Sequence, residues 1–161
     1  MEFEEINGIY KPIPLKFDPL SQQGGYCARY ARKASLDLIL GKSEDNEELW
    51  TPSNAWNFRY HNRTVWKKGQ SPFKANKLRR GQILGIKMPF SIYNGRRDER
   101  NNPVQFTHLA TYVKKQGVHY IVHNFGGEIL ADNLKAFLKN TESEVIAIFS
   151  PKDPIVLENS F

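Results

Sequence analysis

Several features that would identify common classes of protein are scarce or absent in this sequence. Among its 161 residues there is one cysteine, Cys27, which excludes an internal disulfide and a zinc site built from cysteines. No apolar run approaches the roughly 20 residues of a membrane-spanning helix, and the acidic start MEFEE is unlike a secretory signal. We therefore expect no membrane span and synthesis in the cytoplasm. If the protein acts outside its cell, another route must deliver it.

Sequence signatures of cofactor and metal sites are also missing. There is no glycine-rich phosphate loop. His119 and His123, two residues of one predicted strand, are too sparse to count as a metal site. The sequence therefore predicts neither a bound cofactor nor a metal.

What the sequence does have is an excess of positive charge. With 23 Lys and Arg against 17 Asp and Glu, the net charge is +6, which suggests an anionic partner such as nucleic acid, anionic lipid or an anionic cell-wall polymer. The basic residues are spread over 67–100 without the aromatic-basic or helix-turn-helix motifs of nucleic-acid-binding proteins. Nucleic acid is therefore not favoured, and a solvated basic face is the simpler interpretation.

The length and the ordinary composition predict a single domain over residues 1–161. Prolines in residues 1–20 predict an extended N-terminal arm, followed by a core over 22–150. Helices followed by an antiparallel sheet are typical of the α+β class. The expected helices are 26–40, a shorter one near 51–58, and 134–138; the expected strands are 82–87, 106–113, 118–124 and 145–149.

Cys27 follows a glycine pair and opens the predicted helix 26–40. In the first turn of a helix, free backbone N–H groups and the positive end of the dipole favour thiolate over thiol. A thiolate in that position is a plausible nucleophile. The alternative is a buried structural cysteine, which is a common fate of this residue type.

A cysteine nucleophile needs a base, and His108 is the best candidate among the four histidines. It lies near the beginning of the predicted strand 106–113, where alternation puts it on one face with Phe106, Ala110 and Tyr112. The alternative is a half-buried histidine bonded to a backbone carbonyl.

The residue that orients His108 should come from the partner strand 118–124, and the register of the hairpin decides which one faces it. A three-residue loop, with glycine in the left-handed position, puts Asn124 opposite His108. A four-residue loop puts His123 there instead. Both side chains can bond an imidazole, so we favour Asn124 on turn chemistry and keep His123 open.

The order of these segments resembles the papain-like peptidoglycan hydrolases, namely the NlpC-type cysteine peptidases and the cysteine, histidine-dependent amidohydrolase/peptidase (CHAP) domains. Three features depart from those families: Gln82 replaces an acidic residue before the first core strand, Cys27 lacks their frequent Asp-Cys-Ser setting, and the interval from Cys27 to His108 is longer than usual. The segments that carry the resemblance are 25–32 (GYCARYAR), 53–58 (SNAWNF), 78–84 (LRRGQIL), 107–113 (THLATYV) and 120–124 (YIVHN).

The resemblance implies a papain-like fold, with the nucleophile helix packed on an antiparallel sheet, and a thioester mechanism. Cys27 attacks an amide carbonyl, His108 transfers protons, and Asn124 or His123 orients His108. The backbone N–H of Cys27, with the side chain of Gln22 or Gln23, is expected to bind the oxyanion, and Tyr26 to shape the pocket.

The implied substrate is a peptide of bacterial peptidoglycan, cleaved by an amidase or endopeptidase that acts as a lysin or a delivered antibacterial effector. A toxin of this kind would have a cognate inhibitor as a partner. Two other functions stay open. One is an intracellular papain-like thiol protease, deamidase or acyltransferase that acts on protein or lipid. The other is a non-catalytic basic module that binds an anionic polymer.

Overall fold

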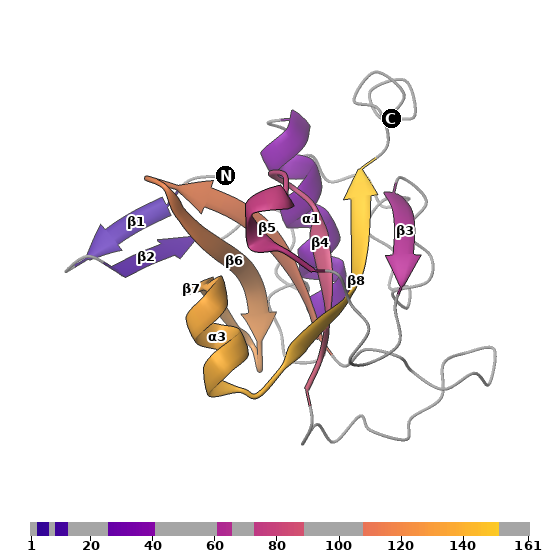
Figure 1. Ribbon diagram of the computed structural model, residues 1–161. Coiled ribbons are helices and arrows are strands. Elements are labelled where there is room, and N and C mark those ends of the chain that lie inside the picture. The colour runs from indigo at the N-terminus through magenta and orange to yellow at the C-terminus, as the bar shows by residue number, and fades with distance from the viewer. Residues whose placement is uncertain are drawn as a thin grey trace.

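A six-stranded antiparallel sheet forms the centre of the fold (Figure 1). The computed structural model describes residues 3–6, 9–12, 26–40, 61–65, 73–88 and 108–151. The strand order is β3-β8-β4-β5-β6-β7, and a separate pair, β1-β2, lies next to β7. The strands are β1 (Phe3–Ile6), β2 (Ile9–Pro12), β3 (His61–Val65), β4 (Ile83–Lys87), β5 (His108–Lys115), β6 (Val118–Phe125), β7 (Glu128–Asn133) and β8 (Glu144–Pro151).

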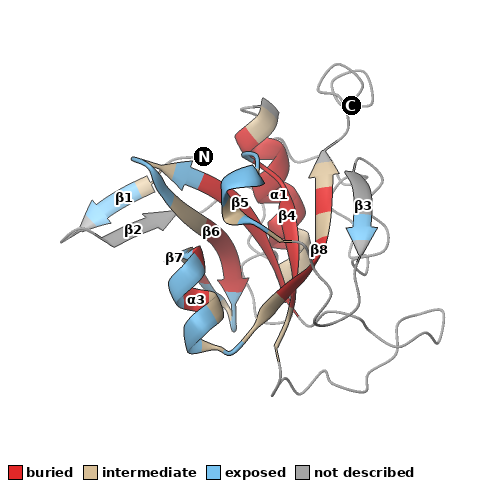
Figure 2. Cartoon of the chain, in the orientation of Figure 1, coloured by how far each residue is buried: buried red, intermediate tan, exposed pale blue. Residues whose placement is uncertain are grey.

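Helices cover both faces of this sheet. The long helix α1 (Cys27–Leu40) packs on one face against β5 and β6, while α3 (Leu134–Asn140) covers β6 and β7 on the other; a short 3-10 helix, η3 (Ala75–Lys77), precedes β4. Residues 30–38 of α1 are buried, but residues 26–29 at its N-terminus keep part of their surface exposed (Figure 2). The first turn of α1 is therefore partly accessible.

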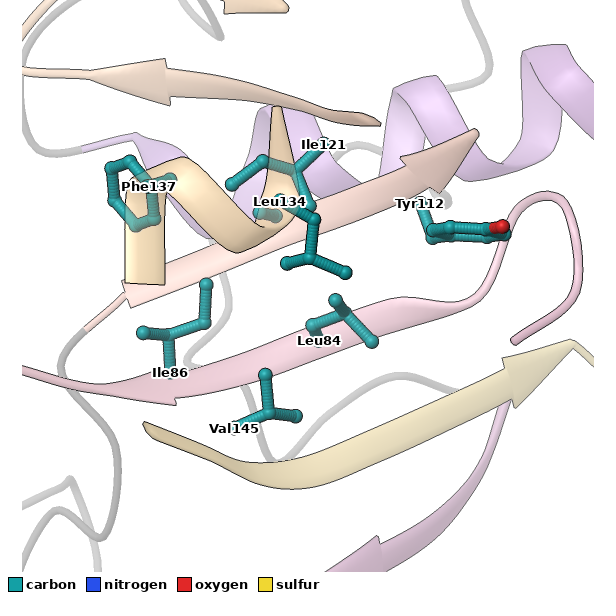
Figure 3. Close-up of a cluster of buried hydrophobic side chains, with 8 residues drawn as sticks. Leu84, Ile86, Tyr112, Ile121, Leu134, Phe137 and Val145 are labelled. Atoms are coloured by element: carbon teal, nitrogen blue, oxygen red, sulfur yellow. The ribbon is translucent and has the colours of Figure 1, made fainter. Parts of the chain in front are cut away.

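The alternation of side chains along β5 divides the core into two layers. Leu109 and Val113 face α1, and the Thr111 hydroxyl donates a hydrogen bond of 2.7 Å to the Ala31 carbonyl oxygen. Ala110 and Tyr112 face the opposite side. That second layer, drawn in Figure 3, contains Leu84, Ile86, Tyr112, Ile121, Leu134, Phe137 and Val145.

The structure confirms the mixed α+β class, and α1 agrees with the helix expected at 26–40. Within the first 12 residues, where we expected an extended arm, β1 and β2 pair as an antiparallel hairpin. β3 and β7 were not expected, while the helix expected near 51–58 lies outside the described residues. In the segments that the structure describes, no helix has the length and apolar character to cross a membrane.

Both hairpin registers that we considered for β5 and β6 are wrong. The turn contains two residues, Gln116 and Gly117, with φ of 49° and 79°, and Lys115 pairs with Val118. Positive φ at both positions is typical of the type I′ turn, whose twist matches that of the flanking strands. Glutamine rarely adopts this conformation, and for that reason the sequence did not indicate so short a turn.

Candidate functional site

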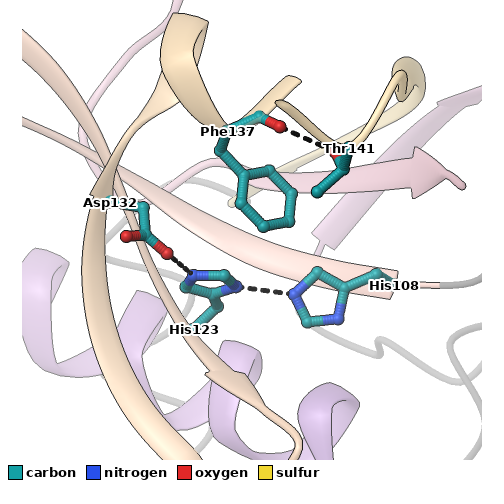
Figure 4. Close-up of polar contacts among 5 residues, drawn as sticks. All are labelled: His108, His123, Asp132, Phe137 and Thr141. Atoms are coloured by element: carbon teal, nitrogen blue, oxygen red, sulfur yellow. Dashed lines mark hydrogen bonds and ion pairs between the residues drawn. The ribbon is translucent and has the colours of Figure 1, made fainter. Parts of the chain in front are cut away.

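Two histidines and an aspartate form a continuous hydrogen-bonded chain on the α3 side of the sheet (Figure 4). The Nε2 atom of His108 lies 2.7 Å from Nδ1 of His123. The Nε2 atom of His123 lies 2.7 Å from Oδ2 of Asp132. His123 has no exposed surface and His108 is 5% exposed, whereas the Asp132 side chain is 40% exposed. The chain therefore joins a buried imidazole to a carboxylate that solvent reaches.

Three neighbouring strands bring these residues together. The last described pair between β5 and β6 is Thr111 with Val122, so the two strands are unpaired where His108 begins β5. The observed register puts His123 diagonally across from His108, within reach of a side chain that leans toward β6. On β7, Asp132 pairs with Ile121, two residues before His123 on the same face.

Aromatic rings enclose the two imidazoles. The Phe125 ring stacks on His123 at 5.6 Å between centroids and meets His108 edge-on at 5.4 Å. Phe137 from α3 meets His123 edge-on at 5.0 Å. These contacts fix the planes of the imidazole rings. Because phenylalanine has no hydrogen-bonding group, they do not determine which imidazole nitrogen carries a proton.

The sulfur of Cys27 lies beside the backbone of the residue that follows His108. Backbone groups of Leu109, Ala28 and Cys27 itself lie near this sulfur and favour its charged form, which lowers its pKa. The groups of Ala28 and Cys27 belong to the N-terminus of α1, where backbone N–H groups lack partners within the helix.

The pairing of β5 explains why the Leu109 N–H has no partner in a neighbouring strand and is available to the Cys27 sulfur. The Tyr112 N–H donates to the Gln82 carbonyl oxygen at 2.8 Å, so the backbone groups of Tyr112 point toward β4. Successive residues of a strand point their backbone groups to opposite sides, so those of Leu109 point toward β6. Because the β5–β6 pairing stops at Thr111, the Leu109 N–H meets the sulfur in place of a strand partner.

The structure thus brings Cys27 to the peptide group between His108 and Leu109. Among the described residues, the contacts of the His108 ring are with His123, Phe125 and Phe137, and no hydrogen bond joins its imidazole to the Cys27 sulfur. The His108 imidazole lies on the α3 side of the sheet and Cys27 belongs to α1 on the other side, so the thiol approaches the backbone next to His108 and not its ring.

Burial shifts the pKa values of Cys27 and His108 in opposite directions. It raises the pKa of the Cys27 thiol, and the three nearby backbone groups offset this only in part. The sulfur is buried although the residue as a whole keeps some exposed surface. Burial, with a smaller contribution from the charge of His123, lowers the pKa of His108 from 6.5 to about 3. At neutral pH the resting state is therefore a neutral thiol with a neutral imidazole, and not the thiolate that the helix N-terminus alone predicts.

The other expected site residues lie elsewhere. The Asn124 side-chain oxygen accepts a hydrogen bond of 2.9 Å from the Gly127 N–H in the turn before β7, and Asn124 pairs with Ile129 on the α1 side of the sheet. Asn124 therefore faces away from His108, and the partner of His108 is His123. The Tyr26 carbonyl accepts the N–H of Tyr30 at the start of α1, and Gln22 and Gln23 lie outside the described residues.

Asp132 is the site residue that sequence reasoning missed. In the sequence, Asp132 directly precedes Asn133 and the helix expected at 134–138, where an acidic residue is easily interpreted as the helix cap. The structure instead has Asn133 as the cap of α3, because its side chain accepts the Ala136 N–H at 3.0 Å. Since one residue is enough for the cap, the second polar residue, Asp132, was the available signal of another role. The described residues hold no group of three or more His, Cys, Asp or Glu arranged to bind a metal.

Comparison with known proteins identifies no relative of this chain. The chain matches no family model, no curated protein and no solved structure. The arguments below therefore rest on the residues of this chain.

Proposed function

We propose that the protein is a papain-like cysteine hydrolase that cleaves amide bonds in the peptides of bacterial peptidoglycan. Cys27 is the nucleophile, His108 the general base and acid, and His123 the residue that orients His108. The observation that carries the proposal is the position of the Cys27 sulfur, at a helix N-terminus and beside the residue that follows a hydrogen-bonded histidine. A nucleophile, a base and an orienting group are the parts that covalent amide cleavage needs.

The reaction proceeds in two steps. The Cys27 sulfur attacks the amide carbonyl carbon as its proton moves to His108, and the backbone N–H groups at the start of α1 receive the oxyanion. His108 then protonates the nitrogen, the C–N bond breaks, and the amine leaves a thioester. In the second step His108 takes a proton from water, the hydroxide displaces the sulfur, and the acid product leaves with the thiol restored.

Alkylation of Cys27 by iodoacetamide at neutral pH, followed by mass spectrometry, tests the catalytic part. We expect His108→Ala to react at least about tenfold more slowly than the native protein, because alkylation of a neutral thiol needs a base to take its proton. His119→Ala is the matched control, because His119 is a histidine of β6 that bonds Tyr112 and not His108. Equal rates for the native protein and His108→Ala would contradict the assignment of His108 as the base of Cys27.

Incubation with purified peptidoglycan tests the substrate. Soluble fragments with new amino and carboxyl ends, absent with Cys27→Ala, would support the proposal, and the masses would identify the bond. A reactive Cys27 without fragments would instead favour the intracellular thiol enzyme. An unreactive Cys27 would favour the anionic-polymer module, for which the exposed cations before β4, Lys74, Lys77, Arg79 and Arg80, offer a surface.

A further inference from the structure

Asp132 ends the chain of hydrogen bonds that begins at His108. It stands on β7 with 40% of its side chain exposed, and its Oδ2 atom lies 2.7 Å from Nε2 of the fully buried His123. The buried imidazole therefore has one hydrogen-bond partner that solvent reaches and a second, His108, that is buried itself.

The carboxylate limits where the protons of both rings can be. An ionised carboxylate only accepts hydrogen bonds, so Nε2 of His123 must carry the proton of this bond. When the His123 ring is neutral, its other nitrogen, Nδ1, is then an acceptor and receives the hydrogen bond from Nε2 of His108; a charged His123 ring would instead donate it. That leaves Nδ1 of His108 without a proton, and in Figure 4 the second ring nitrogen of His108 points away from His123.

We propose that Asp132 is a positioning residue that fixes His108 and His123 as Nε2–H tautomers in series and so makes Nδ1 of His108 the basic nitrogen. The role of this tautomer in catalysis rests on the proposed function. The tautomers of His108 and His123 can be observed even if the protein has no activity. Without the carboxylate, His123 can turn its proton to Nδ1 and donate to His108, which reverses both rings together.

Nitrogen NMR of the imidazoles tests this, because protonated and unprotonated ring nitrogens have different shifts. With ¹⁵N-labelled protein at neutral pH, and with signals assigned by His108→Gln and His123→Gln, we expect both rings as Nε2–H tautomers. In Asp132→Asn and Asp132→Ala we expect Nδ1–H forms to appear in both rings at once. Glu128→Gln, which removes an exposed carboxylate from the same strand, should change neither.

Iodoacetamide alkylation gives the second measurement. We expect Asp132→Asn to slow alkylation of Cys27 at least about tenfold, and Glu128→Gln to leave it unchanged, with circular dichroism showing that both variants are folded. Nδ1–H on His108 in the native protein, a doubly protonated His123, or tautomers unchanged in both Asp132 variants would overturn the proposal. If the tautomers respond as expected while Cys27 is unreactive in every variant, the proposed function fails and the positioning by Asp132 stands.

Discussion

The burial of His108 makes the stability of the protein sensitive to acid. Because burial lowers the pKa of the folded imidazole from 6.5 to about 3, the unfolded chain binds a proton between these values that the folded protein does not. Stability from this group is therefore complete above pH 6.5 and is lost as the pH falls toward 3. Each pH unit in that window corresponds to about 1.4 kcal/mol, so at pH 5 the loss is about 2 kcal/mol.

The predicted loss of stability at pH 5 depends little on the exact pKa of His108 in the folded protein. At pH 5 the loss is set by the ordinary value of the unfolded histidine, and a folded pKa one unit higher changes it by less than about 0.1 kcal/mol. The perturbation is His108→Gln, which removes the titrating group and retains a polar side chain that can bond His123.

Urea unfolding followed by circular dichroism, at pH 8 and pH 5, measures the effect. We expect the free energy of unfolding to fall between the two pH values by about 2 kcal/mol more in the native protein than in His108→Gln. The comparison cancels every group whose pKa is the same in the two proteins. An equal pH dependence in the two proteins would refute the burial of a neutral His108.

Two further predictions follow from other parts of the site and core. Because burial raises the pKa of Cys27, the ultraviolet absorbance of a thiolate, with Cys27→Ser as the reference, should be absent at neutral pH and appear only at alkaline pH; a neutral-pH signal would contradict the resting state described above. Gly81→Ala should destabilise the protein by about 1–3 kcal/mol in urea unfolding, because φ is +86° at Gly81 and an added Cβ would lie 2.7 Å from two carbons of Ile39; a change below about 0.5 kcal/mol would contradict this packing.

Strong local patterns made part of the fold predictable. The helix over 26–40 follows from its apolar spacing and from glycines at both ends, and β4 and β8 follow from short apolar runs bounded by Gly and Pro. β7 was missed because its sequence, EILADN, mixes polar with apolar residues and it lies at the end of the sheet, where most of its side chains keep some exposure. A strand of that kind gains its structure from its neighbour β6, which a local pattern does not reveal.

The residues of the candidate site could be predicted only where they did not depend on how the strands pair. Cys27 and His108 could be selected because a helix start and a strand start are local features. The choice between Asn124 and His123 depended on a hairpin register, which the left-handed conformation of Gln116 determines. Asp132 could not be selected at all without β7, since only the pairing of β6 with β7 brings its carboxylate to His123.

A neutral resting pair is compatible with the proposed reaction if the thiol proton moves during attack. Burial raises the pKa of the Cys27 thiol and lowers the pKa of His108, so transfer of the proton before attack is unfavourable. Asp132 is placed to offset part of this cost, because through His123 its carboxylate faces the imidazolium that forms on His108. The proposed mechanism therefore uses proton transfer during attack, and not a thiolate held in advance.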